Sequence, residues 1–301
     1  MKSHLIALTM ILAFGSTHAQ TQTYINKKGQ THLCGPLTLA DLQDTTYAEW
    51  YNKNYEAFAL TEKNSKWAKQ LKSSQVDIYM GTWCGDSREW VPQFVKLWET
   101  LGLDLDDLNF IALYDGQEQY KQGPNGEEEG KNIHRVPTFV FKQNGDEYAR
   151  IVESPVNDLE TDVAQIALGY PSVPKYRAAS YMMDLLESKS KEDLEENIKT
   201  YFFEAYHRVS KMGELNTLGY VYLRSGRIDE ALTVFRYNTY YFKHNPNVYD
   251  SYAEALAAKG LDDLAIANYQ KVLQIDPDNE NALEQIELLE AKNSQLQSSE
   301  G

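Results

Sequence analysis

The chain has 301 residues, of which 42% are hydrophobic and 12% aromatic, which is enough for two domains of ordinary size and excludes a disordered chain. Its formal net charge of -15 excludes a protein that binds nucleic acid by neutralising phosphates. The basic residues are scattered, so the sequence predicts no attraction to a membrane surface.

Residues 1–19 have the layout of a secretory signal peptide. Lys2 supplies a positive charge, residues 5–14 form an apolar run, and Ala19 is a small residue suited to cleavage. An uncleaved N-terminal anchor is the alternative, but this run is too short to cross a bilayer. We therefore expect a periplasmic or secreted protein without a membrane anchor.

The segment 20–54 is predicted to be an N-terminal helical extension, because Leu42, Tyr47, Trp50 and Tyr51 recur at helical spacings. Residues 55–170 then follow the order strand, helix, strand, loop, hairpin and helix. The strands are expected at 76–80, 108–114, 138–141 and 148–152, and the helices at 86–101 and 159–168. This order predicts an α/β domain.

The stretch 169–174 contains a glycine and two prolines and is the predicted domain boundary. Residues 175–292 are predicted to be entirely helical. Small and aromatic residues recur there 34 positions apart, in the pairs Gly219 and Ala253, Gly226 and Gly260, Ala231 and Ala265, and Phe235 and Tyr269. A helical period of this length resembles the tetratricopeptide repeat, although Lys243 stands where that family usually has proline. The resemblance implies stacked helical hairpins that recruit a protein partner.

Two stacked hairpins alone would leave apolar faces uncovered, because neighbouring repeats bury each other. Residues 175–211 are therefore expected to form a degenerate preceding hairpin, and residues 280–292 a terminal capping helix. The tail 293–301 is predicted to be disordered.

Cys34 and Cys84 are the two cysteines, so the chain can form at most one intramolecular disulfide. Cys84 lies where the strand 76–80 gives way to the helix 86–101. Backbone N–H groups and the helix dipole favour the reactive thiolate at such a position. Asp86 in the first turn opposes this effect, so we predict a moderately activated thiol.

A second set of motifs resembles the thioredoxin superfamily, and its members are Trp83-Cys84-Gly85, Pro92 and Val136-Pro137-Thr138. The resemblance covers about residues 55–170 and implies a thioredoxin-like fold, with a central mixed sheet and flanking helices. It also implies that Pro92 kinks the helix, that a cis peptide bond precedes Pro137, and that this turn faces Cys84. Trp83 is expected to cover the cysteine.

Three departures from the family pattern bear on the chemistry. Ser87 replaces the second cysteine, so a mixed disulfide at Cys84 should persist until an external thiol, or Cys34, attacks it. Ser87 is instead placed to donate a hydrogen bond to the Cys84 sulfur. Ile78 stands where the family usually has a buried acid, and the loop 115–135 is longer than a minimal thioredoxin needs.

Two functions fit these observations. In the first, Cys84, Ser87 and Pro137 carry thiol–disulfide exchange with protein thiols, and an external thiol acts as reductant. In the second, the protein is a redox-inactive binding scaffold. A monothiol glutaredoxin fits poorly because of Trp83 and Asp86. No cofactor or metal is expected, since four closely spaced soft ligands are absent from the sequence, and His134 is interpreted as a loop residue rather than an acid or base for Cys84.

Overall fold

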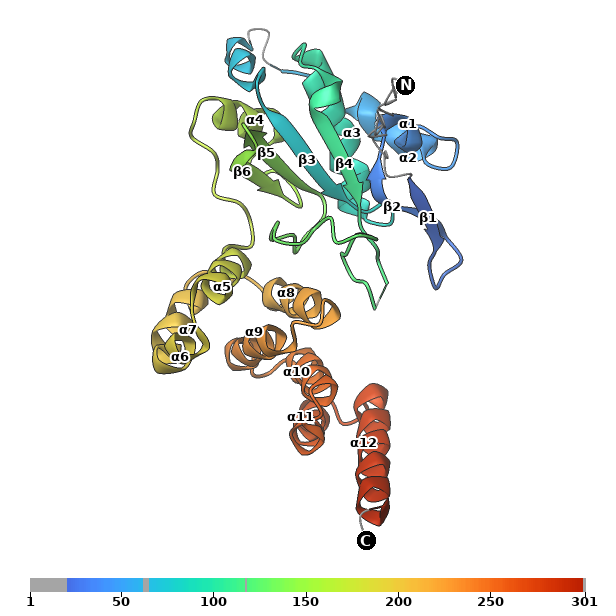
Figure 1. Cartoon of the computed structure of the whole chain (residues 1–301), viewed down its shortest axis with the longest axis vertical. Coiled ribbons are helices and arrows are strands. Elements are labelled where there is room, and N and C mark those ends of the chain that lie inside the picture. The colour runs from blue at the N-terminus through green and yellow to red at the C-terminus, as the bar shows by residue number, and fades with distance from the viewer. Residues whose placement is uncertain (1–20, 62–64, 117, 300–301) are drawn as a thin grey trace, which may run out of the picture.

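The computed structural model describes residues 21–61, 65–116 and 118–299, so the predicted signal peptide lies outside the described residues. Figure 1 shows a sheet flanked by helices, which is formed by the chain up to α4, and an array of helices from α5 onward. The structure therefore confirms the predicted division into an α/β part followed by an all-helical part.

The sheet has six strands in the order β1-β2-β4-β3-β5-β6. Among the strands of the described residues, only β3 and β4 pair in parallel and the other neighbours are antiparallel, so the sheet is mixed as predicted. The strands are β1 (Gln22–Ile25), β2 (Thr31–Leu37), β3 (Gln75–Met80), β4 (Leu108–Ala112), β5 (Thr138–Gln143) and β6 (Asp146–Val152).

Helix α3 packs its apolar side against this sheet. Phe94 and Trp98 are fully buried four residues apart, and the Phe94 ring lies 4.6 Å from that of Phe139 on β5. The core around them fixes the position of α3, and with it the strand–helix junction before it. The helices of this part are α1 (Leu39–Leu42), α2 (Ala48–Ala57), α3 (Gly85–Thr100) and α4 (Leu159–Ala167), with the 3-10 helices η1 (Lys66–Leu71) and η2 (Leu105–Asp107).

The prediction of a wholly helical extension over 20–54 is wrong. Strands β1 and β2 form a hairpin there, and only α1 and the first part of α2 are helical. Strand β2 is stabilised by a distant partner, because Gly35 and Leu37 pair with Ala112 and Phe110 of β4. Such non-local pairing overrides the local pattern, in which a glycine and a proline inside β2 argue against a strand.

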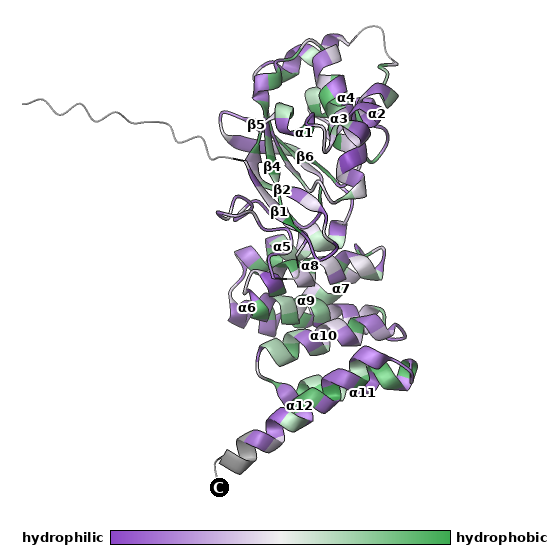
Figure 2. Cartoon of the chain, turned by 90° about the vertical axis from the view of Figure 1, so that its right-hand side faces the viewer, coloured by the Kyte–Doolittle hydropathy of each residue, from purple (hydrophilic) through white to green (hydrophobic). Residues whose placement is uncertain are grey.

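The helical part contains the two predicted hairpins, α8–α9 and α10–α11. Gly226 and Gly260, 34 positions apart, end α8 and α10 with positive φ angles of 77° and 79°. In Figure 2 hydrophobic residues are concentrated where α8 and α9 meet. The helices are α5 (Arg177–Ser188), α6 (Lys191–Glu196), α7 (Ile198–Tyr206), α8 (Met212–Arg224), α9 (Ile228–Tyr241), α10 (Pro246–Ala258), α11 (Asp262–Ile275) and α12 (Glu280–Ser299).

The C-terminal tail differs from its prediction. Helix α12 extends to Ser299, so residues 293–299 continue the capping helix instead of being disordered, and residues 300–301 lie outside the described part. Ala282 and Leu289 pack against the last hairpin, and Asn293 donates a hydrogen bond of 3.2 Å to Asp263 at the start of α11. The helix is therefore held by its neighbour over more turns than the apolar pattern indicates.

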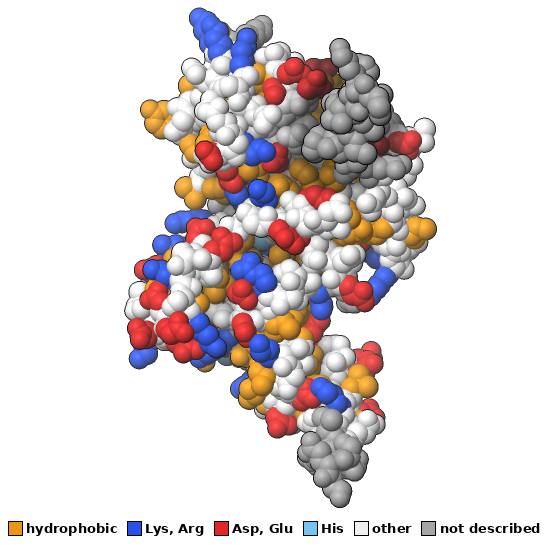
Figure 3. All heavy atoms as spheres, viewed as in Figure 1, with side chains coloured by type: hydrophobic (Ala, Val, Ile, Leu, Met, Phe, Trp, Pro, Cys, Tyr) orange, Lys and Arg blue, Asp and Glu red, His pale blue; other side chains and the backbone are white. Residues whose placement is uncertain are grey.

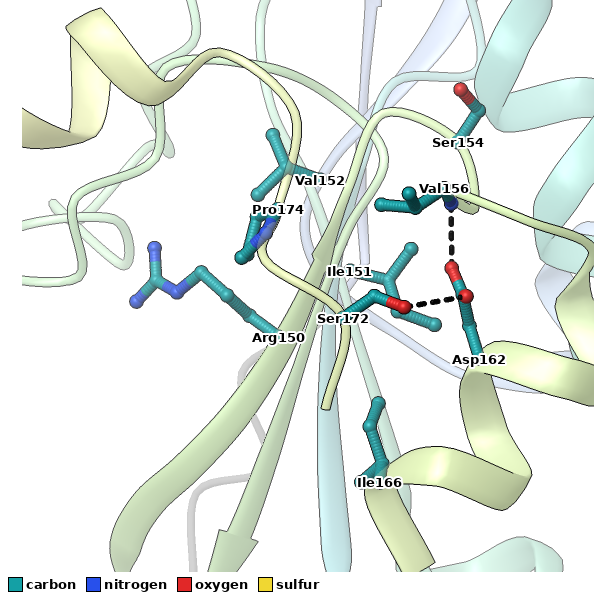
Figure 4. A pocket seen from close by; sticks show the side chains of 9 residues that line it. All are labelled: Arg150, Ile151, Val152, Ser154, Val156, Asp162, Ile166, Ser172 and Pro174. Carbon is teal, nitrogen blue, oxygen red and sulfur yellow. Dashed lines mark hydrogen bonds between the residues drawn. The ribbon is translucent and has the colours of Figure 1, made fainter. Parts of the chain in front are cut away.

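The predicted boundary, residues 169–174, is fastened to the sheet domain. Asp162 of α4 accepts hydrogen bonds from the Val156 backbone at 2.5 Å and from the Ser172 hydroxyl at 3.1 Å, as Figure 4 shows. The cleft beside this carboxylate has a volume of about 10 Å³, room for little more than one water molecule. We interpret the hydrogen bonds of Asp162 as a structural connection that orients the helices, and the small cleft beside them as too small for a ligand.

The close approach of α8 and α9 gives a test of the repeat packing. A β-carbon added at Gly219 would lie less than 3.0 Å from the Phe235 ring, whereas one added at Gly213 in the same helix would contact nothing within 4 Å. We expect Gly219→Ala to lower the free energy of unfolding by about 1–3 kcal/mol through overpacking. Gly213→Ala should cause no loss and a gain of up to about 1 kcal/mol from helix propensity. Urea denaturation of both variants measures this, and equal effects would contradict the packing described.

Candidate functional site

Cys84 occupies the junction between β3 and α3. It is the N-cap of α3, with an extended backbone, and its carbonyl accepts the first helical hydrogen bond from Arg88 N–H at 3.0 Å. Its side chain is partly exposed and packs with the apolar cluster that includes Trp83 and Val136. The sulfur therefore lies at the positive end of a 16-residue helix, where a thiolate is stabilised.

The turn before β5 lies against this sulfur. The Val136–Pro137 peptide bond is cis, as the sequence predicted, and the Cys84 thiol donates a hydrogen bond of 3.2 Å to the Val136 carbonyl. The thiol also contacts the Asp86 carboxylate, 3.9 Å away. Thr138 closes the turn by donating to the Arg135 carbonyl at 2.8 Å. The structure thus brings together Cys84, Asp86 and the 136–138 turn.

Two supporting residues have other partners than expected. The Ser87 hydroxyl is fully buried and accepts a hydrogen bond of 3.2 Å from Gly81 N–H, so the predicted bond to the Cys84 sulfur is absent from the described residues. Trp83 folds back over Gly81 and donates its indole N–H to the Leu113 carbonyl at 2.8 Å. Both residues fix the end of β3, and Pro92 is buried in α3 at the expected place.

Cys34 is remote from Cys84 in the sheet. It lies on β2, and β4 separates β2 from β3. Two strand spacings amount to about 10 Å, and a disulfide requires Cα atoms within about 7 Å of each other. Both cysteines are free, and Cys34 is buried, with the Tyr114 hydroxyl donating to its sulfur. This geometry argues against Cys34 as a resolving thiol.

The N-terminal hairpin braces the same junction. The His32 ring Nδ1 lies 3.2 Å from the Thr82 hydroxyl, which also accepts a hydrogen bond of 3.1 Å from Leu33 N–H. Thr82 stands two residues before Cys84. Burial lowers the pKa of His32, so the ring is neutral at pH 7 and does not repel nearby cations. The hairpin that the sequence did not predict therefore helps to position the cysteine.

Lys121 is the main residue of the site that sequence reasoning missed. It lies in the β4–β5 loop (residues 113–137) and is only 4% exposed. Its ammonium donates to the His134 carbonyl at 3.0 Å and to the Tyr120 hydroxyl at 2.8 Å. Burial and, to a smaller extent, the charge of Arg135 lower its pKa to about 7, while Cys84 and Glu153 act in the opposite direction. A single lysine in a polar loop carries no periodic signal that could have revealed its burial.

His134 is fully buried beside this lysine. Burial and the charges of Lys121, Arg135 and Arg150 lower the pKa of His134 to about 3, so its ring is neutral. The ring packs edge-on against Tyr176 at 5.9 Å, and among the described residues it makes no hydrogen bond with Cys84. Its geometry is that of a packing residue between the sheet and the helices.

The β4–β5 loop also contacts the helical part. Arg135 pairs with Glu153 at 3.2 Å, donates to the Gly213 carbonyl at 2.6 Å, and stacks over Tyr176 at 4.5 Å. The Gln122 amide donates to the Arg224 carbonyl at 2.7 Å. A groove of about 300 Å³ lies beside these contacts, lined by Asp115, Tyr120, Asn216, Thr217, Tyr220, Arg224 and Glu254.

Charge and hydropathy mark out no second site. On the face shown in Figure 3, acidic and basic side chains are interspersed. No group of three or more His, Cys, Asp and Glu side chains within 21–61, 65–116 and 118–299 is placed to hold a metal ion. No helix in the part that the structure describes is both long and apolar enough to cross a membrane.

Comparison with known proteins identifies one of the repeats. The tetratricopeptide repeat family model matches residues 246–279, which contain α10 and α11. This confirms the second of the two predicted repeats. No curated protein matches the chain significantly. Tetratricopeptide repeats form concave surfaces that bind other proteins, which indicates a role in protein–protein interaction.

The buried neutral His134 predicts acid sensitivity. Its folded pKa of about 3 lies below the ordinary 6.5, so between these values the unfolded chain binds a proton that the folded chain does not. Stability therefore falls as the pH drops below 6.5, by about 2 kcal/mol between pH 7 and pH 5. Between pH 7 and pH 5 we expect His134→Gln to lose about 2 kcal/mol less of its free energy of unfolding than the wild type. Urea denaturation at pH 7 and at pH 5 measures this difference. His244→Gln, at an exposed position, should behave as the wild type. An unchanged pH dependence in His134→Gln would exclude this origin.

Proposed function

We propose that the protein is an exported thioredoxin-like protein in which Cys84 carries thiol–disulfide exchange and forms mixed disulfides with protein partners, while the helical repeats hold the partner. The observation that carries the proposal is the placement of the Cys84 thiol, at the N-terminus of α3 and 3.2 Å from the carbonyl that precedes the cis Pro137. Export is inferred from residues 1–19, which have the layout of a secretory signal peptide.

Several features support a thioredoxin-like domain over residues 55–170. The cysteine follows a central parallel strand, a proline lies inside the next helix, and the cis-prolyl turn opens the antiparallel strand β5. We place the repeat domain at 175–292 and assign the β1–β2 hairpin to the sheet domain, since β2 pairs with β4.

The proposed step is an exchange between a thiolate and a disulfide. The Cys84 thiolate attacks one sulfur of a partner disulfide, a new sulfur–sulfur bond forms, and the partner's own disulfide breaks. The second partner sulfur leaves with the electron pair and takes a proton from solvent. An external thiol, as its thiolate, later attacks the partner sulfur of the mixed disulfide and releases Cys84 as a thiolate.

Ser87 determines how long the mixed disulfide lasts. In a dithiol site the residue at this position attacks the adduct, but a serine hydroxyl cannot do so. Cys34 lies two strands away, so no thiol of this chain is in reach. The protein would therefore hold its partner covalently until an external thiol arrives, which suits a carrier or a slow exchange protein.

Cys84→Ser and Cys34→Ser give the direct test. We expect the wild-type protein, treated with oxidised glutathione, to gain one glutathione by mass spectrometry. Cys84→Ser should gain none, because the buried Cys34 is inaccessible, and Cys34→Ser should gain as much as the wild type. A wild-type protein without adduct, or with adduct on Cys34, would reject the proposed chemistry.

Restoring a second thiol gives a further prediction. In Ser87→Cys the new thiol lies one helical turn from Cys84, so it should attack the adduct, form the 84–87 disulfide and expel glutathione. We expect the adduct of Ser87→Cys to disappear after excess glutathione is removed, while the adducts of the wild type and of Ser87→Ala persist. Mass spectrometry over time measures this. Equal persistence in all three proteins would contradict the role given to Ser87.

The second candidate function is a redox-inactive protein-binding scaffold, and the matched repeat favours it. A groove of about 520 Å³ lies between α5–α7 and the α9–α10 pair. Leu194, Arg236, Tyr237 and Tyr252 contribute to its lining. Failure of all adduct formation by Cys84, with the fold intact, would leave this function alone.

A further inference from the structure

We propose that Lys121 is the electrostatic partner of the Cys84 thiolate. It would hold the positive charge opposite the sulfur and accept the proton that the thiol loses. The inference deepens the proposed function, because it concerns the same cysteine, but it is tested by a different measurement. Lys121 belongs to neither sequence motif and lies in the β4–β5 loop.

Hydrogen bonds fix Lys121 beside the segment that also accepts a hydrogen bond from Cys84. Lys121 N–H donates to the Tyr114 carbonyl at 2.9 Å, and Tyr114 lies two residues after the end of β4, the strand that pairs with β3. The Lys121 ammonium donates to the carbonyl of His134, two residues before the carbonyl that accepts the Cys84 thiol. Side chain and sulfur therefore converge on the same short segment, residues 134–136.

The ammonium is buried without a carboxylate partner of its own. Glu153, an acid whose charge acts on it, is already paired with Arg135 at 3.2 Å, and no salt bridge of Lys121 is present among the described residues. Its two hydrogen bonds use two of its three donors. A buried charge without a counter-ion is costly, so this site favours an anion nearby.

Cys84 supplies that anion when it ionises. The charges and titratable groups around Lys121 are Tyr120, His134, Arg135, Glu153 and Cys84, and those at the sulfur are Asp86, Tyr120 and Lys121. His134 is neutral and Arg135 is neutralised by Glu153. Cys84 is therefore the neighbour whose charge remains to be balanced, and its interaction raises the pKa of Lys121.

The proton transfer balances within the pair. The thiol loses its proton, the neutral amine gains it, and the result is a thiolate beside an ammonium with no change in total charge. When the thiolate is consumed in a mixed disulfide, the ammonium loses its partner and releases the proton to solvent or to the leaving thiolate. Lys121 would thus favour the thiolate form of Cys84, which is the form that attacks a disulfide.

Lys121→Met in a Cys34→Ser background tests the inference. We expect the pH profile of iodoacetamide alkylation at Cys84 to move to higher pH, with the rate at pH 7 falling about tenfold, which corresponds to one unit in the midpoint. Lys131→Met is the matched control, because Lys131 is an exposed lysine of the same loop. Its profile should equal that of the parent. A folded Lys121→Met with the parental profile would overturn the inference.

A second measurement does not depend on the variant's folding. Coupling between two sites is reciprocal, so blocking Cys84 must change Lys121. We expect the NMR titration of the Lys121 side chain to shift to lower pH after Cys84 is alkylated with iodoacetamide. An unchanged titration would overturn the inference. If the Lys121 titration shifts but no glutathione adduct forms, the exchange function is rejected and the interaction between Lys121 and Cys84 is retained.

Discussion

The Arg135 guanidinium is the contact on which the arrangement of the site depends. It forms an ion pair with Glu153 on the sheet side and donates a hydrogen bond to the Gly213 carbonyl of α8. It also stacks on the ring of Tyr176 at the start of α5. Hydrogen bonds to charged groups contribute about 1.5–3 kcal/mol each, more than most surface contacts. Because Arg135 precedes Val136 and Pro137, these bonds also hold the turn that accepts the Cys84 thiol. The joint between the two parts and the cysteine site are therefore one structure.

The buried polar side chains of the site have partners within the protein. Ser87, Lys121 and His134 are all nearly inaccessible, and each contacts a backbone group or a ring. A buried polar group that lost its partner would destabilise the fold, so these residues fix the loop in one conformation. A rigid turn opposite the sulfur follows, and a rigid turn favours a defined orientation of anything that approaches Cys84.

How much the sequence predicts depends on whether the signal is local. The junction at Cys84, the turn at Pro137 and the repeat hairpins follow from motifs and from a 34-residue period, and the structure contains each of them. Strand β2 was missed because its stability comes from pairing with β4, far along the chain. The burial of Lys121 was missed for a similar reason, since it depends on the fold of a long loop without a periodic pattern. The partner of Ser87 is local, but a sequence motif does not show which backbone group a hydroxyl bonds.

The unusual length of the β4–β5 loop has a physical explanation in these contacts. Its extra residues reach the helices, where Gln122 bonds the Arg224 carbonyl and Asn132 bonds Glu187 of α5. Other contacts also join the sheet to the helices, because Val152 of β6 packs in the buried cluster of the helical part and Lys175 donates a hydrogen bond to Ser154. Within the loop, Tyr120 lines the groove beside α8 and also bonds Lys121.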